Sequence, residues 1–226
     1  MVPRSQLYGE HFSGVEKGRK VLALSYDDGP NDPWTMRLLE VLAKHEVMAT
    51  FFLLGRRVRE RPELARAVAE AGHTVGNHTF THPNLIFISR ARLRQELEET
   101  SKAIEDATGA RPTLFRPPFG GRRPGTFAMV RELGMTPIMW RVTCYDWSAK
   151  SHLKIVKHAR RQIVGGEIIL LHDGGHLRMG EDRSHSVRAT DELIGEYKQQ
   201  GFTFVTVPAM IEMQRAVQPT LGMAAR

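Results

Sequence analysis

The chain has little cysteine and no long apolar run. Its 226 residues contain a single cysteine, Cys144, which excludes an internal disulfide framework and any metal site built from cysteine alone. Histidine and carboxylate side chains must therefore hold any metal. A free cysteine is usually a small buried apolar residue, so we do not expect Cys144 to be a nucleophile. No window approaches the roughly 18 to 20 consecutive apolar residues that a membrane-spanning helix needs.

Targeting and linker segments are also missing from the sequence. The first twenty residues lack the apolar core of a secretory signal peptide. We therefore expect a cytoplasmic protein if this start is native, and a cell-envelope or extracellular protein if it is a trimmed form. No linker, low-complexity tract or repeat divides the chain. We expect one domain over residues 1–226, with the motifs in a core of about 20–215 and an N-terminal extension at 1–19.

The charge is basic, with 32 Lys and Arg against 25 Asp and Glu and a formal net charge of +7. This charge favours weak attraction to anionic partners such as an anionic wall polymer. The arginine clusters at 56–61 and 90–94 lack the interleaved aromatic residues and the motif of a nucleic-acid site. We therefore expect solvated helix faces there and no nucleic-acid partner.

Apolar, β-branched runs alternate with helix-like segments along the chain. We expect strands at 20–26, 49–54, 73–76, 114–116, 136–142, 167–171 and 203–207. We expect helices at 33–45, 62–71, 89–108, 152–164 and 187–200. Seven β units separated by helices predict a parallel α/β fold, which is either a barrel or a closely related open sheet.

Ionisable side chains follow five of these strands at the point where each strand ends. They are Asp27 and Asp28, then His78 and His82, then Arg116, then Asp146 beside Trp147, and finally His172 and Asp173. In a parallel α/β fold the carboxyl ends of the strands converge on one face, where functional residues collect. The sequence therefore predicts a single functional rim.

Two histidines of this rim have the chemistry of metal ligands. His78 and His82 have the spacing of a helical metal pair, but Pro83 disfavours helical geometry and favours a loop that turns both rings inward. Two histidines and one carboxylate leave open positions for water and substrate, as a catalytic zinc or another divalent metal requires. Asp27 and Asp28 point to opposite faces of an extended backbone, so they cannot share one role.

Five ordered segments, SYDDGP, HTFTHP, RPPFG, YDW and LLHD, resemble the motifs of the polysaccharide deacetylase family, the NodB-homology group of carbohydrate esterase family 4. The resemblance covers about residues 21–207. It implies a distorted (β/α) barrel of about seven parallel strands. It also implies a hydrolase that uses a divalent metal to remove N-acetyl groups, or O-acetyl groups of some glycans.

The resemblance assigns different roles to the two aspartates. Asp28 would join His78 and His82 on the metal, most simply Zn²⁺, although Co²⁺, Ni²⁺ or Mn²⁺ would also fit. Asp27 would be the general base for a metal-activated water. The oxyanion would be met by the metal and by a backbone N–H near Phe119.

The resemblance also implies an acid and its supporting residues. His172 would protonate the leaving amine, with Asp146 favouring its protonated form, while Arg116 would pair with Asp27. Trp147 and Leu170 would form the pocket for the acetyl methyl group. The simpler alternatives are that Trp147 is a core residue and that Arg116 braces a loop.

Four further positions carry separate expectations. Tyr26 stands where the family usually has Phe, and Thr143 stands where many members have an acid. His176 and His185 lie in a polar loop, and we expect them to be surface residues and not ligands.

The leading hypothesis is an enzyme that deacetylates an amino-sugar glycan such as a chitooligosaccharide or peptidoglycan. One alternative is a metal-dependent amidohydrolase acting on a small non-sugar amide. Another is a catalytically silent carbohydrate-binding relative. The sequence favours the enzyme over the silent relative because all three expected ligands and both expected acid–base residues are present. It does not identify the glycan, the native metal or the oligomeric state.

Overall fold

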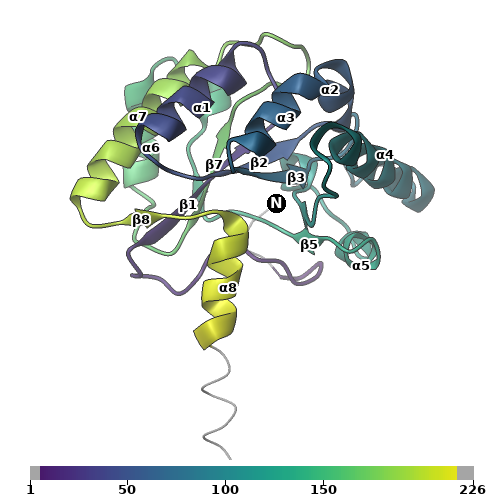
Figure 1. Cartoon of the computed structure of the whole chain (residues 1–226). Helices are drawn as coiled ribbons and strands as arrows, with labels where there is room; N and C mark the ends of the chain where they lie inside the picture. The colour runs from purple at the N-terminus through teal and green to yellow at the C-terminus, as the bar shows by residue number, and fades with distance from the viewer. Residues whose placement is uncertain (1–5, 218–226) are drawn as a thin grey trace, which may run out of the picture.

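The computed structural model describes residues 6–217, and in it strands and helices alternate along the chain (Figure 1). The strands are β1 (Val21–Asp27), β2 (Thr50–Leu53), β3 (Thr74–Asn77), β4 (Leu114–Phe115), β5 (Thr136–Pro137), β6 (Val142–Thr143), β7 (Ile168–His172) and β8 (Thr203–Phe204). The helices are α1 (Trp34–Lys44), α2 (Gly55–Glu60), α3 (Pro62–Glu70), α4 (Arg90–Thr108), α5 (Thr126–Glu132), α6 (His152–Arg160), α7 (Ser184–Gln199) and α8 (Val207–Val217). Two short 3₁₀ helices, η1 (Pro118–Gly120) and η2 (Asp146–Ser148), complete the elements.

Seven strands form one parallel sheet in the order β5-β4-β3-β2-β1-β7-β6, and β8 pairs with the start of β1. This arrangement confirms the predicted α/β fold with about seven parallel strands. Among the described residues no pairing joins β5 to β6, so the curled sheet stays open between its two edge strands. Strand β1 pairs with β7 from Ala23 to Asp27, so that Asp27 lies opposite His172.

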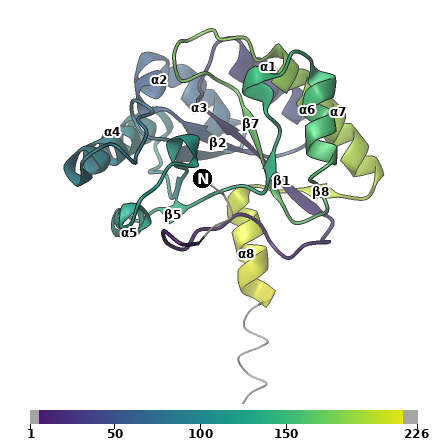
Figure 2. The same cartoon turned by 180° about the vertical axis from the view of Figure 1, so that it is seen from behind.

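Helices and loops cover both faces of the sheet, which gives the protein two apolar cores. Leu22, Leu24 and Tyr26 of β1 point into a core that they share with α1, α3, α6 and α7. Ala23 points to the opposite face, into a core that includes α8 and α5. Helix α8 lies below the sheet, away from the other helices, when the chain is viewed from the front or from behind (Figures 1 and 2). Because side chains alternate along a strand, Asp27 shares the face of Ala23.

The predicted strand at 136–142 is wrong as a single element. Its first part, β5, pairs with β4, and its last part, β6, pairs with β7. These partners lie toward opposite ends of the sheet, so one straight strand cannot pair with both. The residues between them cross the open side, where Phe12 forms a parallel bridge to Ile138. Part of the N-terminal extension at 1–19 is therefore packed against the sheet.

The predicted helices at 33–45, 62–71, 89–108, 152–164 and 187–200 are all confirmed within a few residues. Helices α2, α5 and α8 were not predicted. Helix α2 has only six residues, Gly55–Glu60, which is too short to show an amphipathic period. Gly109 ends α4 in the left-handed conformation at a φ of 76°, which costs a glycine little because it has no Cβ.

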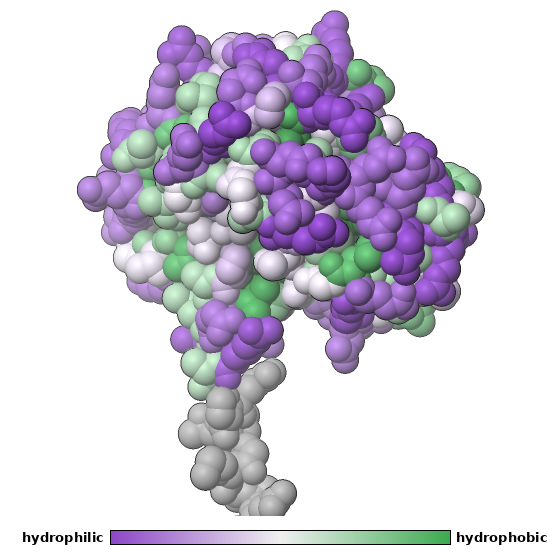
Figure 3. Space-filling model, turned by 45° about the vertical axis from the view of Figure 1, so that its right-hand side comes forward, coloured by the Kyte–Doolittle hydropathy of each residue, from purple (hydrophilic) through white to green (hydrophobic). Residues whose placement is uncertain are grey.

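Hydrophilic side chains cover much of the face in Figure 3, with smaller hydrophobic areas between them. Within residues 6–217, no helix has both the length and the apolar composition to cross a membrane.

Candidate active site

The side chains predicted at the strand ends meet around one cavity of about 420 Å³. Asp27 ends β1 and His172 ends β7, while His78 follows β3. Asp28, His78, His82 and His172 line the cavity, together with Phe119 and Trp147. Three of the residues that bound this site have left-handed backbones without being glycine, with φ values of 72° at Asp28, 60° at His82 and 56° at Phe119. Such conformations cost about 1–3 kcal/mol each and turn side chains in directions that regular elements do not allow.

Asp28, His78 and His82 form a buried cluster whose ligand atoms all lie within 4.8 Å of one another. The Asp28 Oδ1 atom is 3.5 Å from His78 Nε2 and 3.2 Å from His82 Nε2. Two donor atoms that bind one zinc ion tetrahedrally lie roughly 3.4 Å apart. The Asp28 Oδ1 atom is also buried without a hydrogen-bond partner. The donor set and its spacing therefore fit a divalent cation.

The protonation of these groups also suits a cation. Burial raises the pKa of Asp28 to about 7, and the neighbouring negative charge of Asp27 adds to this rise. Burial lowers the pKa of His78 to about 3 and lowers the pKa of His82 as well. Both imidazoles are consequently neutral near pH 7, which is the state in which histidine binds metal. The buried Asp28 carboxylate gains from a positive charge beside it.

The Asp27 carboxylate lies against a buried arginine. Arg116 Nη1 donates to Asp27 Oδ1 at 2.7 Å, and neither side chain is more than 5% exposed. The guanidinium also stacks on the Phe52 ring, 4.1 Å from its centroid. Burial raises the pKa of Asp27, while the charges of Arg116 and His172 oppose this rise. Arg116 therefore orients one carboxylate oxygen and leaves Oδ2 toward the cluster, 3.7 Å from His78 Nε2.

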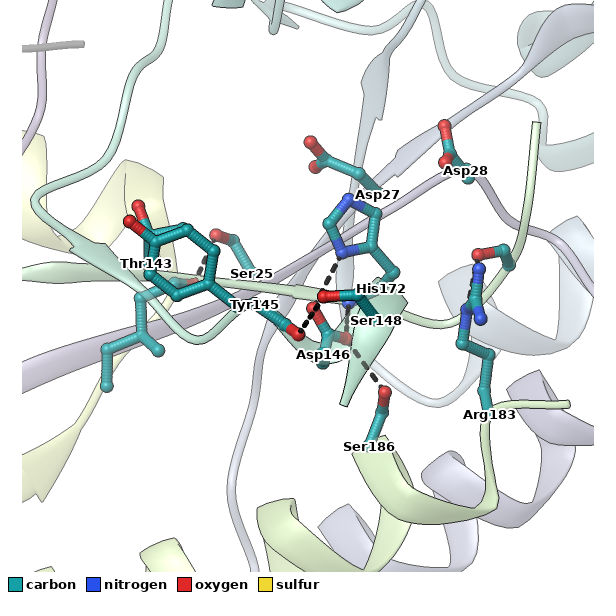
Figure 4. A network of polar contacts seen from close by, with 12 residues as sticks. Ser25, Asp27, Asp28, Thr143, Tyr145, Asp146, Ser148, His172, Arg183 and Ser186 are labelled. Carbon is teal, nitrogen blue, oxygen red and sulfur yellow. Dashed lines mark hydrogen bonds and ion pairs between the residues drawn. The ribbon is translucent and has the colours of Figure 1, made fainter. Parts of the chain in front are cut away.

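His172 has a carboxylate partner of its own. Its Nδ1 lies 2.9 Å from Asp146 Oδ1, and its backbone N–H donates to Asp146 Oδ2 at 2.7 Å. Ser186, at the start of α7, donates to the same Oδ2 at 2.7 Å, as Figure 4 shows. Burial alone lowers the pKa of His172, but Asp146, with Asp28 and Asp27 beyond it, more than offsets this effect and raises the pKa to about 9. The ring is thus protonated near pH 7.

Apolar and aromatic side chains form the other walls of the cavity. Leu170 is buried, whereas Trp147 is 46% exposed and its ring meets His172 edge-on at 5.3 Å between centroids. Trp147 is therefore a rim residue and not part of the core, contrary to the simpler alternative. Phe119 is 59% exposed and packs edge-on against His82 at 4.5 Å.

The structure also explains the two positions that depart from the family motifs. Tyr26 points into the helix-covered core, where its hydroxyl lies 3.0 Å from Thr190 Oγ1, so it does not reach the site. Thr143 accepts a hydrogen bond from Trp140 Nε1 at 2.8 Å and carries no charge. The hydroxyl that contacts Asp146 belongs to Ser186, and no motif in the sequence identifies that residue.

We expected His176 to be a surface residue and not a ligand. Its side chain is 37% exposed and lies outside the cluster of candidate ligand atoms, but it faces the site and not only the solvent. The His176 ring lines the cavity and stacks on His82, with 4.5 Å between the centroids. Arg183 and Glu181, from the same loop, also line the cavity. In the sequence, the only indication was a histidine three residues beyond the LLHD motif. The sequence cannot show that the loop folds back over the rim.

Comparison with known proteins identifies the family to which the sequence is similar. The family model for polysaccharide deacetylases matches residues 14–138. A peptidoglycan-N-acetylglucosamine deacetylase of Bacillus cereus is 33% identical over 210 residues, which cover 92% of this chain and 74% of that protein. A chitooligosaccharide deacetylase of a Bradyrhizobium species is 36% identical over 204 residues, which cover 87% of this chain and 93% of that protein.

Solved structures show the same fold. The peptidoglycan N-acetylglucosamine deacetylase Bc1960, in complex with 4-naphthalen-1-yl-N-oxidanyl-benzamide, matches at a TM-score of 0.81 and 33% identity, over 88% of this chain and 91% of that one. BA3943 of Bacillus anthracis, a CE4 family pseudoenzyme, matches at a TM-score of 0.81 and 30% identity, over 89% of this chain and 68% of that one. From its sequence, fold and relatives, the chain belongs to the polysaccharide deacetylase family and is a polysaccharide or oligosaccharide deacetylase.

Proposed function

We propose that the protein removes N-acetyl groups from an amino-sugar glycan, such as a chitooligosaccharide or a peptidoglycan strand, with Asp27 as general base and His172 as general acid. One observation carries this proposal: a carboxylate paired with Arg116 and a histidine paired with Asp146 flank the same Asp–His–His cluster. The two pairs give the base and the acid opposite electrostatic partners, which is how one site runs both kinds of proton transfer at one pH.

Asp28, His78 and His82 would hold the divalent cation, and Zn²⁺ suits a set of two histidines and one carboxylate best. The cation, when bound, would polarise the acetyl carbonyl and acidify a water. Co²⁺, Ni²⁺ and Mn²⁺ share this ligand preference closely enough to be alternatives.

Asp27 would accept a proton as the water oxygen forms a bond to the acetyl carbon. Arg116 holds Oδ1 of this carboxylate at 2.7 Å, which leaves Oδ2 to take the proton. The backbone N–H of Phe119 would stabilise the oxyanion that forms, because a fixed donor in a dry pocket favours developing charge. Asp27 and Arg116 are both buried beside this position.

His172 would then donate its proton to the sugar nitrogen as the carbon–nitrogen bond breaks, which releases acetate and the free amine. Asp146 holds Nδ1, so Nε2 is the nitrogen left to face the substrate. A raised pKa keeps that proton in place near pH 7. Trp147 and Leu170 would receive the acetyl methyl group, because both line the cavity with apolar surface.

The test is a mass-spectrometric screen with N-acetylated chitooligosaccharides, peptidoglycan fragments, O-acetylated glycans and small N-acetyl amides as substrates. We expect the zinc-loaded protein to remove acetyl groups from an amino-sugar glycan, the chelator-treated protein to lose this activity, and added Zn²⁺ to restore it. Activity only on small amides would favour the amidohydrolase alternative. Glycan binding without acetate release would favour the silent relative.

A further inference from the structure

The two histidines of the metal cluster are held in different ways. His78 is oriented by a hydrogen bond, because its Nδ1 lies 2.7 Å from the backbone carbonyl of Arg116. Such a bond on the second ring nitrogen is the usual way in which a protein fixes a metal-binding imidazole. His82 lacks this support, because its Nδ1 is buried and has no hydrogen-bond partner among the described residues. Something else must therefore fix the direction of the His82 ring.

Ring packing is the contact that surrounds His82. Phe119 meets it edge-on at 4.5 Å and 74°, and His176 stacks on it at 4.5 Å and 23°. Phe119 and His176 also contact each other, with 5.4 Å between their centroids. Phe119 contacts the ring only edge-on and is itself 59% exposed, so it holds His82 weakly. The nearly parallel His176 ring covers a face of the imidazole and restricts its rotation.

His176 belongs to a loop that is itself anchored. We call residues 174–183, which join β7 to α7, the strap. The Asn31 side-chain amide donates to the backbone carbonyl of Glu181 at 2.9 Å, and its Oδ1 accepts from the Gly180 N–H at 2.7 Å. At the other end, Arg183 Nε donates to the carbonyl of Gly174 at 2.7 Å. In Figures 1 and 2 the segment between β7 and α7 arches over the same end of the sheet as α1 and α2.

The position of His176 within the strap is fixed by α2. The Arg56 guanidinium of α2 donates from Nη2 to the His176 carbonyl. The His176 Nδ1 atom lies 3.9 Å from Asp28 Oδ2, which is too long for a hydrogen bond. His176 is also absent from the cluster whose ligand atoms all lie within 4.8 Å of one another. Its contact with the metal cluster is therefore made by its ring face and not by a nitrogen.

We propose that His176 is a positioning residue for the metal ligand His82, and that its stacked ring replaces the hydrogen bond that His82 lacks. This inference rests on the proposed metal site. It assigns a role in metal affinity to the strap, a segment outside the five motifs. Hydrogen-bonded partners of metal ligands contribute about 10–100-fold to metal affinity, and we expect a stacked ring in their place to contribute at the lower end of that range. An aromatic ring of similar size should therefore replace His176, whereas a methyl group should not.

The test compares Zn²⁺ affinities by competition with a chromophoric chelator. We expect His176→Ala to weaken Zn²⁺ binding about 10-fold or more, and His176→Phe to retain most of the affinity. His152→Ala is the matched control: His152 opens α6 and pairs with Glu192 at 3.7 Å, away from the cavity. It removes one surface-accessible imidazole and should leave the affinity unchanged. Thermal melting of each apo variant checks that it is folded.

The outcomes separate this inference from the proposed function. If the wild-type chain does not bind Zn²⁺, the metal site itself is wrong. If the wild-type chain binds Zn²⁺ and His176→Ala binds equally well, the positioning role is wrong. If His176→Phe is as weak as His176→Ala and also changes the visible spectrum of the Co²⁺-loaded protein, a nitrogen of His176 contacts the metal and the packing role is overturned. An unchanged Co²⁺ spectrum with retained affinity in His176→Phe supports it.

Discussion

The site has two halves that use histidine for opposite purposes. The metal half is the Asp28, His78 and His82 cluster, and the acid half is the pair of His172 and Asp146. In the metal half, burial lowers the pKa of His78 to about 3. In the acid half, His172 is also mostly shielded from solvent, yet Asp146 raises its pKa to about 9. The difference lies in the partner of Nδ1, which is a neutral backbone carbonyl for His78 and a carboxylate for His172. Burial disfavours the charged imidazole, and only a nearby negative charge reverses that preference. The partner thus decides whether a buried histidine is neutral, as a metal ligand must be, or protonated, as a general acid must be.

The largest effect is expected from removing the proposed base, Asp27, while the candidate metal ligands stay in place. Asp27→Asn keeps the size of the side chain and takes away the proton acceptor, so we expect kcat to fall about 10²–10⁴-fold. Zn²⁺ affinity should change little, because the expected ligands are Asp28, His78 and His82. Steady-state kinetics and chelator competition measure the two quantities. Loss of Zn²⁺ binding with the loss of activity would place Asp27 on the metal and merge the two roles.

A smaller effect is expected from removing the charge that distinguishes His172 from His78. As the proposed general acid, His172 could donate a proton only in its protonated form, so activity should fall as the pH rises through its pKa, which is about 9. Asp146→Asn removes the negative charge while burial remains, so the pKa should fall and the alkaline limb of the kcat profile should move roughly 1–3 units to lower pH. The pH dependence of kcat in both forms tests this. An unmoved limb would mean that another group sets it.

The smallest effect is expected at Tyr26, which lies on the helix-covered side of β1, opposite the face that carries Asp27. Tyr26→Phe removes a buried hydroxyl and leaves Thr190 Oγ1 without that partner. We expect a loss of about 1 kcal/mol in the free energy of unfolding and unchanged kcat/KM. Urea denaturation and kinetics measure the two. A fall in kcat/KM at unchanged stability would show that the helix-covered core around Tyr26 influences the site.

Local sequence patterns anticipated the parts of this protein that depend on neighbouring residues. The alternation along β1 places Leu24 and Tyr26 on one face and Asp27 on the other, and this follows from strand geometry alone. The order of the motifs placed charged groups at the ends of parallel strands, which always converge on one edge. The rim was therefore predictable before any distance was known.

Contacts between distant segments were not predictable from the same patterns. The segment 136–142 has the composition of one strand, but its ends pair with β4 and β7. Three strands, β3, β2 and β1, lie between those partners in the sheet. Likewise, Ser186 and His176 show no motif of their own. They reach the site because α7 and the strap fold back over it.

The sequence by itself thus determined the alternating α/β architecture and the residue types at each strand end, because both depend on local periodicity. The tertiary structure decided which nitrogen each imidazole presents, which histidines are neutral or charged, and how His82 is held. Those properties depend on burial and on partners such as Arg116 and Asp146, which lie 38 and 26 residues from the histidines that they contact. A pKa depends on the groups that are close in space, and the order of residues along the chain does not show which groups those are.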